Sequence, residues 1–113
     1  MPARAPETLD EALDWLRKHF DPEAGRGLSA SFELDLSGPG GGELGLRLVD
    51  GVLHLAPGRV AAPDARLRLA AADYFGILAG RENADLLYMA GRIEIEGDLR
   101  RVLKLRTLFR AER

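Results

Sequence analysis

The chain has 113 residues, no cysteine and a formal net charge of −2. This length supports a single domain spanning residues 1–113, and the lack of cysteine excludes disulfides and cysteine-ligated metals and suits a reducing, cytoplasmic location. The charge balance argues against a nucleic-acid partner, which requires a clear basic excess, and no segment has the length and apolar character needed for stable membrane insertion.

A helix is predicted at residues 9–20. Thr8 and Glu11 have the spacing of a capping box, in which each side chain satisfies a free amide of the first turn. Apolar residues then recur every three or four positions, which is the period of one buried helix face. Asp21-Pro22 ends this helix, and residues 22–27 are expected to form a loop.

Four strands are expected next. Strict apolar–polar alternation at residues 31–36 and 44–48 predicts two half-buried strands, joined by a glycine-rich hairpin connection at 38–42. After the Asp50-Gly51 turn, a third strand is expected at about 53–55. The connection 59–64 then leads to a fourth strand at 65–69.

The remaining chain alternates helix and strand. Residues 71–79 are helical in spacing and almost entirely apolar, with Asp73 as the only charge and Gly80 as the terminating glycine. A shorter helix at 83–90 precedes a strand at 92–96, and Asp98 caps a last helix that runs to about Arg110. This order predicts an α+β fold in which helices cover one face of a five-stranded mixed sheet.

Charges on the outward face of the sheet predict the strand order. Each strand carries a single sign there, in the residues Glu33 and Asp35, Arg47, Arg66 and Arg68, and Glu94 and Glu96. Opposite charges on neighbouring strands attract and like charges repel, so the order 2-1-4-5 is favoured. The hairpin at Asp50-Gly51 places the third strand beside the second, which gives the order 3-2-1-4-5. The charged face is expected to be open to solvent.

The segment 87–98, L-Y-M-A-G-R-I-E-I-E-G-D, closely resembles a signature of sterol carrier protein 2-type lipid-binding domains. The resemblance extends over about residues 32–109 and includes the motifs Asp50-Gly51, Pro63-Asp64, Gly80, Tyr88-Met89-Ala90-Gly91 and Gly97-Asp98. It implies a hydrophobic tunnel between the sheet and the helices that holds a lipid. The chain ends Ala111-Glu112-Arg113, without the peroxisomal tripeptide of eukaryotic members, so a standalone prokaryotic member is implied.

The predicted helices carry more apolar surface than one sheet contact requires. Residues 71–79 are apolar nearly all round, and the last helix has an apolar arc of about 220°, against a stripe of about 100° for a single contact. The arc consists of Leu99, Val102, Leu103, Leu105, Leu108 and Phe109. This excess apolar surface could be covered by a lipid, a second subunit or a membrane, and the resemblance favours the lipid.

The predicted ligand-binding residues lie on the inward face of the sheet and on the helices that cover it. They are Phe32, Leu34, Leu46, Leu67, Phe75, Leu78, Met89, Ile93, Leu103, Arg106 and Phe109. Arg106 has two interpretations: a counter-charge for a carboxylate or phosphate headgroup, or a guanidinium that extends past apolar neighbours to water.

No Ser-His-Asp grouping, metal-spaced histidine set or close carboxylate pair is evident on the predicted helical face. We therefore predict neither catalysis nor a metal or cofactor, and instead non-enzymatic binding and transfer of a fatty acid, acyl-CoA, phospholipid or isoprenoid lipid, with transient membrane contact. Two alternatives remain open. One is an accessory subunit that presents a lipid or quinone precursor to partner enzymes, and the other is a solid-core interaction domain that forms a homodimer.

Overall fold

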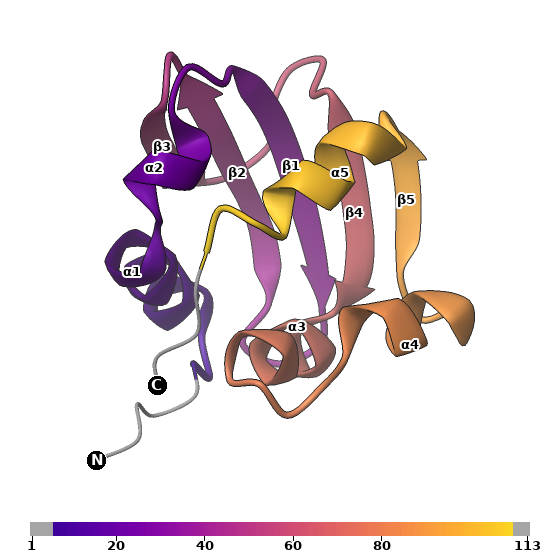
Figure 1. Ribbon diagram of the computed structural model, residues 1–113. Coiled ribbons are helices and arrows are strands. Elements are labelled where there is room, and N and C mark those ends of the chain that lie inside the picture. The colour runs from indigo at the N-terminus through magenta and orange to yellow at the C-terminus, as the bar shows by residue number, and fades with distance from the viewer. Residues whose placement is uncertain (1–5, 110–113) are drawn as a thin grey trace.

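The computed structural model describes residues 6–109 of the chain. Figure 1 shows α5 crossing in front of the sheet, α1 beside the sheet on the β3 side, and α3 and α4 along one end of it. The elements follow in the order α1 (Leu9–His19), α2 (Pro22–Gly25), β1 (Ala30–Ser37), β2 (Gly42–Val49), β3 (Val52–Pro57), β4 (Ala65–Ala70), α3 (Ala71–Leu78), α4 (Ala84–Met89), β5 (Glu94–Gly97) and α5 (Leu99–Leu105).

The five strands form one mixed sheet in the order β3-β2-β1-β4-β5, which confirms the predicted order and the α+β class. The β1–β4 pair is parallel, and the other three pairs are antiparallel. The register places Arg66 between Glu33 and Glu96, and Arg68 between Asp35 and Glu94. The signs of charge therefore alternate from β1 to β5, as the cross-strand argument requires.

The hydrophobic core lies on the inward face of the sheet. Every second residue of β1 and β2 contributes to it, and the N-terminal helix covers part of it with Ala12, Leu13 and Leu16. The cap of α1 is as predicted, because Thr8 Oγ1 accepts a hydrogen bond from the Glu11 N–H at 3.2 Å. The Glu11 carboxylate in turn accepts from the Glu7 N–H at 2.9 Å. In a capping box the donor would be the N–H of the next residue, Thr8. Within residues 6–109, no helix is long and apolar enough to cross a membrane.

Two predicted boundaries near the N-terminus and at β5 are wrong. The expected loop at 22–27 contains the short helix α2, because Pro22 fits the first helical turn and Asp21 Oδ1 accepts from the Glu23 N–H at 3.0 Å. Strand β5 starts at Glu94 instead of Arg92. The Arg92 N–H donates to the Leu87 carbonyl at 2.9 Å, closing the end of α4, and is thus not available to the sheet.

The last helix is shorter than predicted. Helix α5 ends at Leu105, and its last turn is closed by the Thr107 hydroxyl, which donates to the Lys104 carbonyl at 2.7 Å. Phe109 then forms an isolated β-bridge with Phe20. The predicted end near Arg110 lies outside the described residues. Apolar periodicity continued beyond the helix because Leu108 and Phe109 still face the core in the segment that follows it.

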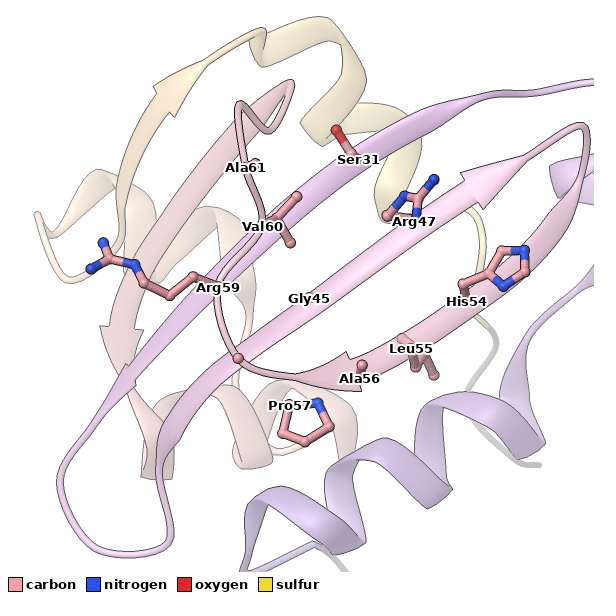
Figure 2. Close-up of a pocket in the computed structure, with 11 residues that line it drawn as sticks. Ser31, Gly45, Arg47, His54, Leu55, Ala56, Pro57, Arg59, Val60 and Ala61 are labelled. Atoms are coloured by element: carbon pink, nitrogen blue, oxygen red, sulfur yellow. The ribbon is translucent and has the colours of Figure 1, made fainter.

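The outer face of the sheet is not fully open to solvent, contrary to the prediction. The connection between β3 and β4 crosses this face, and Figure 2 shows its Pro57–Ala61 segment passing over β2 and β1. The Val60 N–H donates to Glu33 Oε1 at 2.8 Å, and Arg66 Nε donates to Oε2 of the same carboxylate at 2.9 Å. Glu33 is consequently buried, with 0% of its surface exposed. Alternation identifies the outward face, but it carries no information on a connection that covers it.

Candidate ligand-binding site

A cavity of about 500 Å³ lies between the inward face of the sheet and the helices. This volume is within the range of roughly 300–1,000 Å³ that is usual for small-molecule sites. Its described walls are Trp15, Leu16, Leu34, Leu67, Leu69, Tyr74, Ile77, Leu78, Glu82, Asn83, Ala84, Asp85, Tyr88, Ile93, Ile95, Leu99, Val102, Leu103, Leu105, Arg106 and Phe109.

The sheet wall of the cavity is aliphatic and belongs to one half of the sheet. Leu34, Leu67 and Ile95 are direct cross-strand neighbours on β1, β4 and β5. None of the described lining residues comes from β2 or β3, and α1 packs against the β3 side. The cavity thus lies over β1, β4 and β5, where α1 does not fill the space.

The mouth of the cavity lies between α4 and α5. Three of its lining side chains are about half exposed, Tyr88 at 48%, Leu99 at 47% and Leu103 at 52%. Arg106, which follows α5, donates from Nη1 to Asp85 Oδ1 on α4 at 2.7 Å, and both side chains are solvent-exposed. One ion pair therefore links the two helices beside an apolar opening.

The predicted ligand-binding residues lie in three places. The cavity is lined by Leu34, Leu67, Leu78, Ile93, Leu103, Arg106 and Phe109. Phe32 and Leu46 face each other across β1 and β2 in the packed core, and Phe75 is also buried in the core. Met89 is 80% exposed on α4 and lies outside the cavity walls.

Several wall residues were not identified from the sequence. Leu69 and Ile95 have the same alternation as Leu67 and Ile93, so extending that pattern would have found them. Trp15 and Tyr74 lie on helices whose rotation about their own axes the sequence does not determine. Trp15 stacks on His19 with ring centroids 3.8 Å apart and planes at 12°.

An ion pair between exposed Arg92 and buried Asp73 holds α3, and with it part of the cavity wall. Asp73 is 5% exposed, and Arg92 donates to its two carboxylate oxygens from Nη2 at 2.8 Å and from Nε at 3.1 Å. This two-point geometry fixes orientation as well as distance. The pair connects α3 to the segment just before β5. In the chain these two segments flank α4, whose residues border the cavity mouth.

A second hollow, of about 480 Å³, lies on the opposite face of the sheet beside the β3–β4 connection. Figure 2 shows Arg47 and His54 close together on β2 and β3, whereas Arg59 points away from them. Arg59 pairs with Glu43 at 3.3 Å. No helix covers this hollow, and its border with Arg47 and His54 does not suit a lipid chain.

The outer face also carries an acidic cluster formed by Glu33, Asp35 and Glu43, whose carboxylate oxygens lie within 4.8 Å of one another. Arginines neutralise it, with Arg66 at 2.9 Å from Glu33 and Arg68 at 3.5 Å from Asp35. We interpret the cluster as an ion-pair network that stabilises the β1–β4 pairing.

Comparison with solved structures shows the same fold in other proteins. The solution structure of palmitated SCP2L2 from Aedes aegypti is 21% identical, with a TM-score of 0.71 over 97% of this chain and 99% of that chain. The inverting sec-alkylsulfatase Pisa1 from Pseudomonas sp. is 19% identical, with a TM-score of 0.81 over 94% of this chain but only 17% of the sulfatase. A ubiquinone synthesis protein, UbiJ-SCP2, is 17% identical, with a TM-score of 0.60 over 77% of this chain and 72% of that chain.

No curated protein matches the chain. A family model does match, over residues 11–110, and that range contains every described residue of the cavity wall. The matched family is the one whose signature the segment 87–98 resembles, and the strand order agrees with it. The chain belongs to the SCP-2 sterol transfer family.

Proposed function

We propose that this protein binds an elongated hydrophobic ligand in the cavity between the sheet and the helices, and carries or presents it without altering it chemically. The cavity is the observation that carries this proposal, because its sheet wall is entirely aliphatic and apolar side chains are exposed at its mouth. Family membership and the palmitated relative support a lipid as the ligand class. A fatty acid, acyl-CoA, phospholipid or isoprenoid lipid fits this description.

The chemistry of the wall supports a binding role over catalysis. Among the described lining residues there is no Ser, Thr, Cys, His or Lys that could form a nucleophile–base pair. The charged lining groups, Glu82, Asp85 and Arg106, are exposed, and two of them are paired with each other. Such an arrangement suits a rim that contacts a polar headgroup while the walls hold the apolar part.

A pair of matched substitutions tests the proposal. Leu67→Trp places an indole in the cavity, and Leu46→Trp places the same group in the packed core on the same face of the sheet. We expect Leu67→Trp to abolish binding of a fluorescent fatty acid and to keep its melting temperature. Leu46→Trp should overpack the core, at a cost of about 1–3 kcal/mol, and leave binding of the fatty acid by the folded fraction intact.

The opposite result is equally clear. If the wild-type protein binds no fatty acid, and both substitutions destabilise it equally, the space beside Leu67 is a packed core and the proposal is wrong. Native mass spectrometry of the purified protein then distinguishes the dimeric interaction domain, which would show a clean dimer mass without bound lipid.

A second candidate function is presentation of a hydrophobic substrate to an enzyme. Two structural matches favour it: one is to a ubiquinone synthesis protein, and the other covers only a small part of a much larger sulfatase. Stable co-purification of an enzyme with the tagged chain, and its loss in Leu103→Asp at the cavity mouth, would support presentation over free carriage.

A further inference from the structure

The hydroxyl of Tyr74 has no hydrogen-bond partner anywhere in the described residues. Burial raises the pKa of this phenol well above its ordinary value, so the hydroxyl is neutral. Buried tyrosine hydroxyls usually have a partner, because the group loses its hydration when it is enclosed. The Tyr74 phenol is therefore a hydrogen-bonding group of the cavity wall that the described protein residues leave unused.

The free hydroxyl is accessible, and it belongs to a residue of the cavity wall. Among the fully sealed side-chain polar atoms of residues 6–109, only Asp35 Oδ1 lacks a partner. The Tyr74 oxygen is also unpartnered and is not one of the sealed atoms, so it borders open space. The space that Tyr74 lines is the cavity between the sheet and the helices.

The surroundings of Tyr74 determine which ligand group it suits. Its neighbours on α3 in the cavity wall are Ile77 and Leu78, and the sheet wall opposite is aliphatic. Arg106 is the only cation among the described lining residues, and it lies at the mouth in an ion pair with Asp85. A carboxylate or phosphate placed deep in the cavity would therefore remain uncompensated. An uncharged oxygen would not have this cost, and the phenol can donate to it or accept from it.

We propose that Tyr74 recognises an uncharged oxygen, a carbonyl or a hydroxyl, carried within the apolar body of the ligand. The proposal rests on the proposed function and narrows its ligand class to oxygenated apolar molecules over bare hydrocarbons. In this arrangement the cavity wall selects for length and hydrophobicity, and a single hydrogen bond fixes the position of the ligand along the cavity.

The test compares two ligands that differ only in one carbonyl, tetradecan-2-one and tetradecane, supplied from cyclodextrin. Trp15 provides the signal, since it is the only tryptophan of the chain and lines the same cavity. We expect the wild-type protein to bind the ketone about five- to tenfold more tightly than the alkane, as one net hydrogen bond predicts. In Tyr74→Phe this ratio should fall to about one, with the affinity for the alkane unchanged or higher.

The other tyrosine of the chain supplies the matched control. Tyr88 also lines the cavity but is half exposed at its mouth, so Tyr88→Phe should keep the wild-type preference for the ketone. Thermal denaturation without ligand is a further check. Because the Tyr74 hydroxyl has no partner in the described protein, Tyr74→Phe should keep or raise the melting temperature.

Three results would overturn the inference: equal affinity of the wild-type protein for ketone and alkane, an undiminished preference in Tyr74→Phe, or a marked loss of thermal stability in that variant. Failure of the proposed function would look different. In that case the wild-type protein would bind neither of these ligands nor a fluorescent fatty acid.

Discussion

Glu33 is a buried carboxylate that remains charged. Burial alone would raise its pKa, but hydrogen bonds from the Val60 N–H and the Arg66 guanidinium outweigh burial and lower the pKa to about 2. Asp35, two residues along the same strand, has the opposite shift, because burial and the neighbouring Glu33 charge raise its pKa. The two neighbouring carboxyl groups thus have opposite pKa shifts, and Asp35 Oδ1 is buried without a hydrogen-bond partner among the described residues.

Replacing Glu33 tests this account. In Glu33→Gln one amide oxygen can still accept from Val60, but the amide nitrogen then meets the Arg66 donor. We expect a loss of about 1–3 kcal/mol in the free energy of unfolding at pH 7, measured by urea denaturation. Because the pKa of Glu33 is lower in the folded state, its stabilising contribution is present above about pH 4.5 and is lost as the pH falls toward about 2.

The difference between the wild-type protein and Glu33→Gln should therefore narrow progressively over that acidic range. Glu94→Gln is the control, because Glu94 is an exposed outward-facing residue of β5 and should change stability by less than about 0.5 kcal/mol. A gap between wild type and Glu33→Gln that stays constant from pH 7 to pH 2 would show that charge at Glu33 does not contribute.

At the scale of elements, the junction between β5 and α5 depends on the conformation of one glycine. Gly97 has a φ of +107°, and a Cβ there would collide with the Asp64 carbonyl oxygen and lie 2.8 Å from the Ala65 Cα. The next residue, Asp98, donates its N–H to the same carbonyl at 2.9 Å and caps α5 by accepting from the Arg100 N–H at 3.0 Å. Close approach of two backbones therefore positions the helix that borders the cavity.

Two glycine substitutions separate steric collision from backbone strain. Gly97→Ala should destabilise the protein by about 3 kcal/mol, because it adds a collision with the backbone to an unfavourable φ. Gly91→Ala should cost only about 1 kcal/mol, since Gly91 has a φ of +78° but open space around its Cβ position. Chemical denaturation of both variants gives the comparison, and equal losses would show that the collision is relieved by a small shift.

Element by element, the sequence predicts what depends on periodicity and on local chemistry. Alternation located the strands, and single-sign outward charges ordered them, because both effects act between neighbouring residues. The end of α5 was overestimated, since Leu108 and Phe109 extend the apolar pattern beyond the helix. The Asp73–Arg92 pair and the cover over Glu33 were missed, because each depends on contacts between residues far apart in sequence.

The same limit applies to the candidate site. Alternation placed Leu34, Leu67 and Ile93 on the inward face, and these residues do line the cavity. It did not show that α1 covers the half of the sheet where Phe32 and Leu46 pack. The sequence also did not show how α3 and α4 are rotated about their axes. Met89 was therefore placed in the wall although it is exposed, and Tyr74 was not singled out.

At the scale of the whole molecule, stability is unevenly distributed between the sheet and the cavity mouth. Strand β1 is paired on both edges, covered by core residues on one face and by the β3–β4 connection on the other. Helices α4 and α5 each have a single buried residue, Leu87 and Val102. Few buried contacts permit local opening at low free energy, so the mouth should open more often than the sheet.

Hydrogen exchange followed by mass spectrometry tests this distribution. Amides of β1 should exchange slowest, and those of α4 and α5 fastest among the elements of residues 6–109. Saturation with a fatty acid should slow exchange in α4 and α5 by roughly tenfold or more, because a bound chain bridges both helices to the sheet. Slowing that appears only on the outer face, near residues 57–61, would place the ligand in the other hollow.

The parallel pairing of β1 with β4 has a consequence for the order of events in folding. Strands β1 and β2 are consecutive in the chain, whereas Ser31 and Asp64, which join β1 to the start of β4, are 33 residues apart. Closing that longer loop costs more entropy, so the three-stranded meander is expected to form before β4 docks. Until then β1 is an edge strand: it is paired with β2, but the edge that later binds β4 is free to pair with other chains. When β4 docks, the β3–β4 connection covers Glu33 and the free edge of β1 becomes paired. The same step thus ends the interval in which the folding chain is most prone to aggregate.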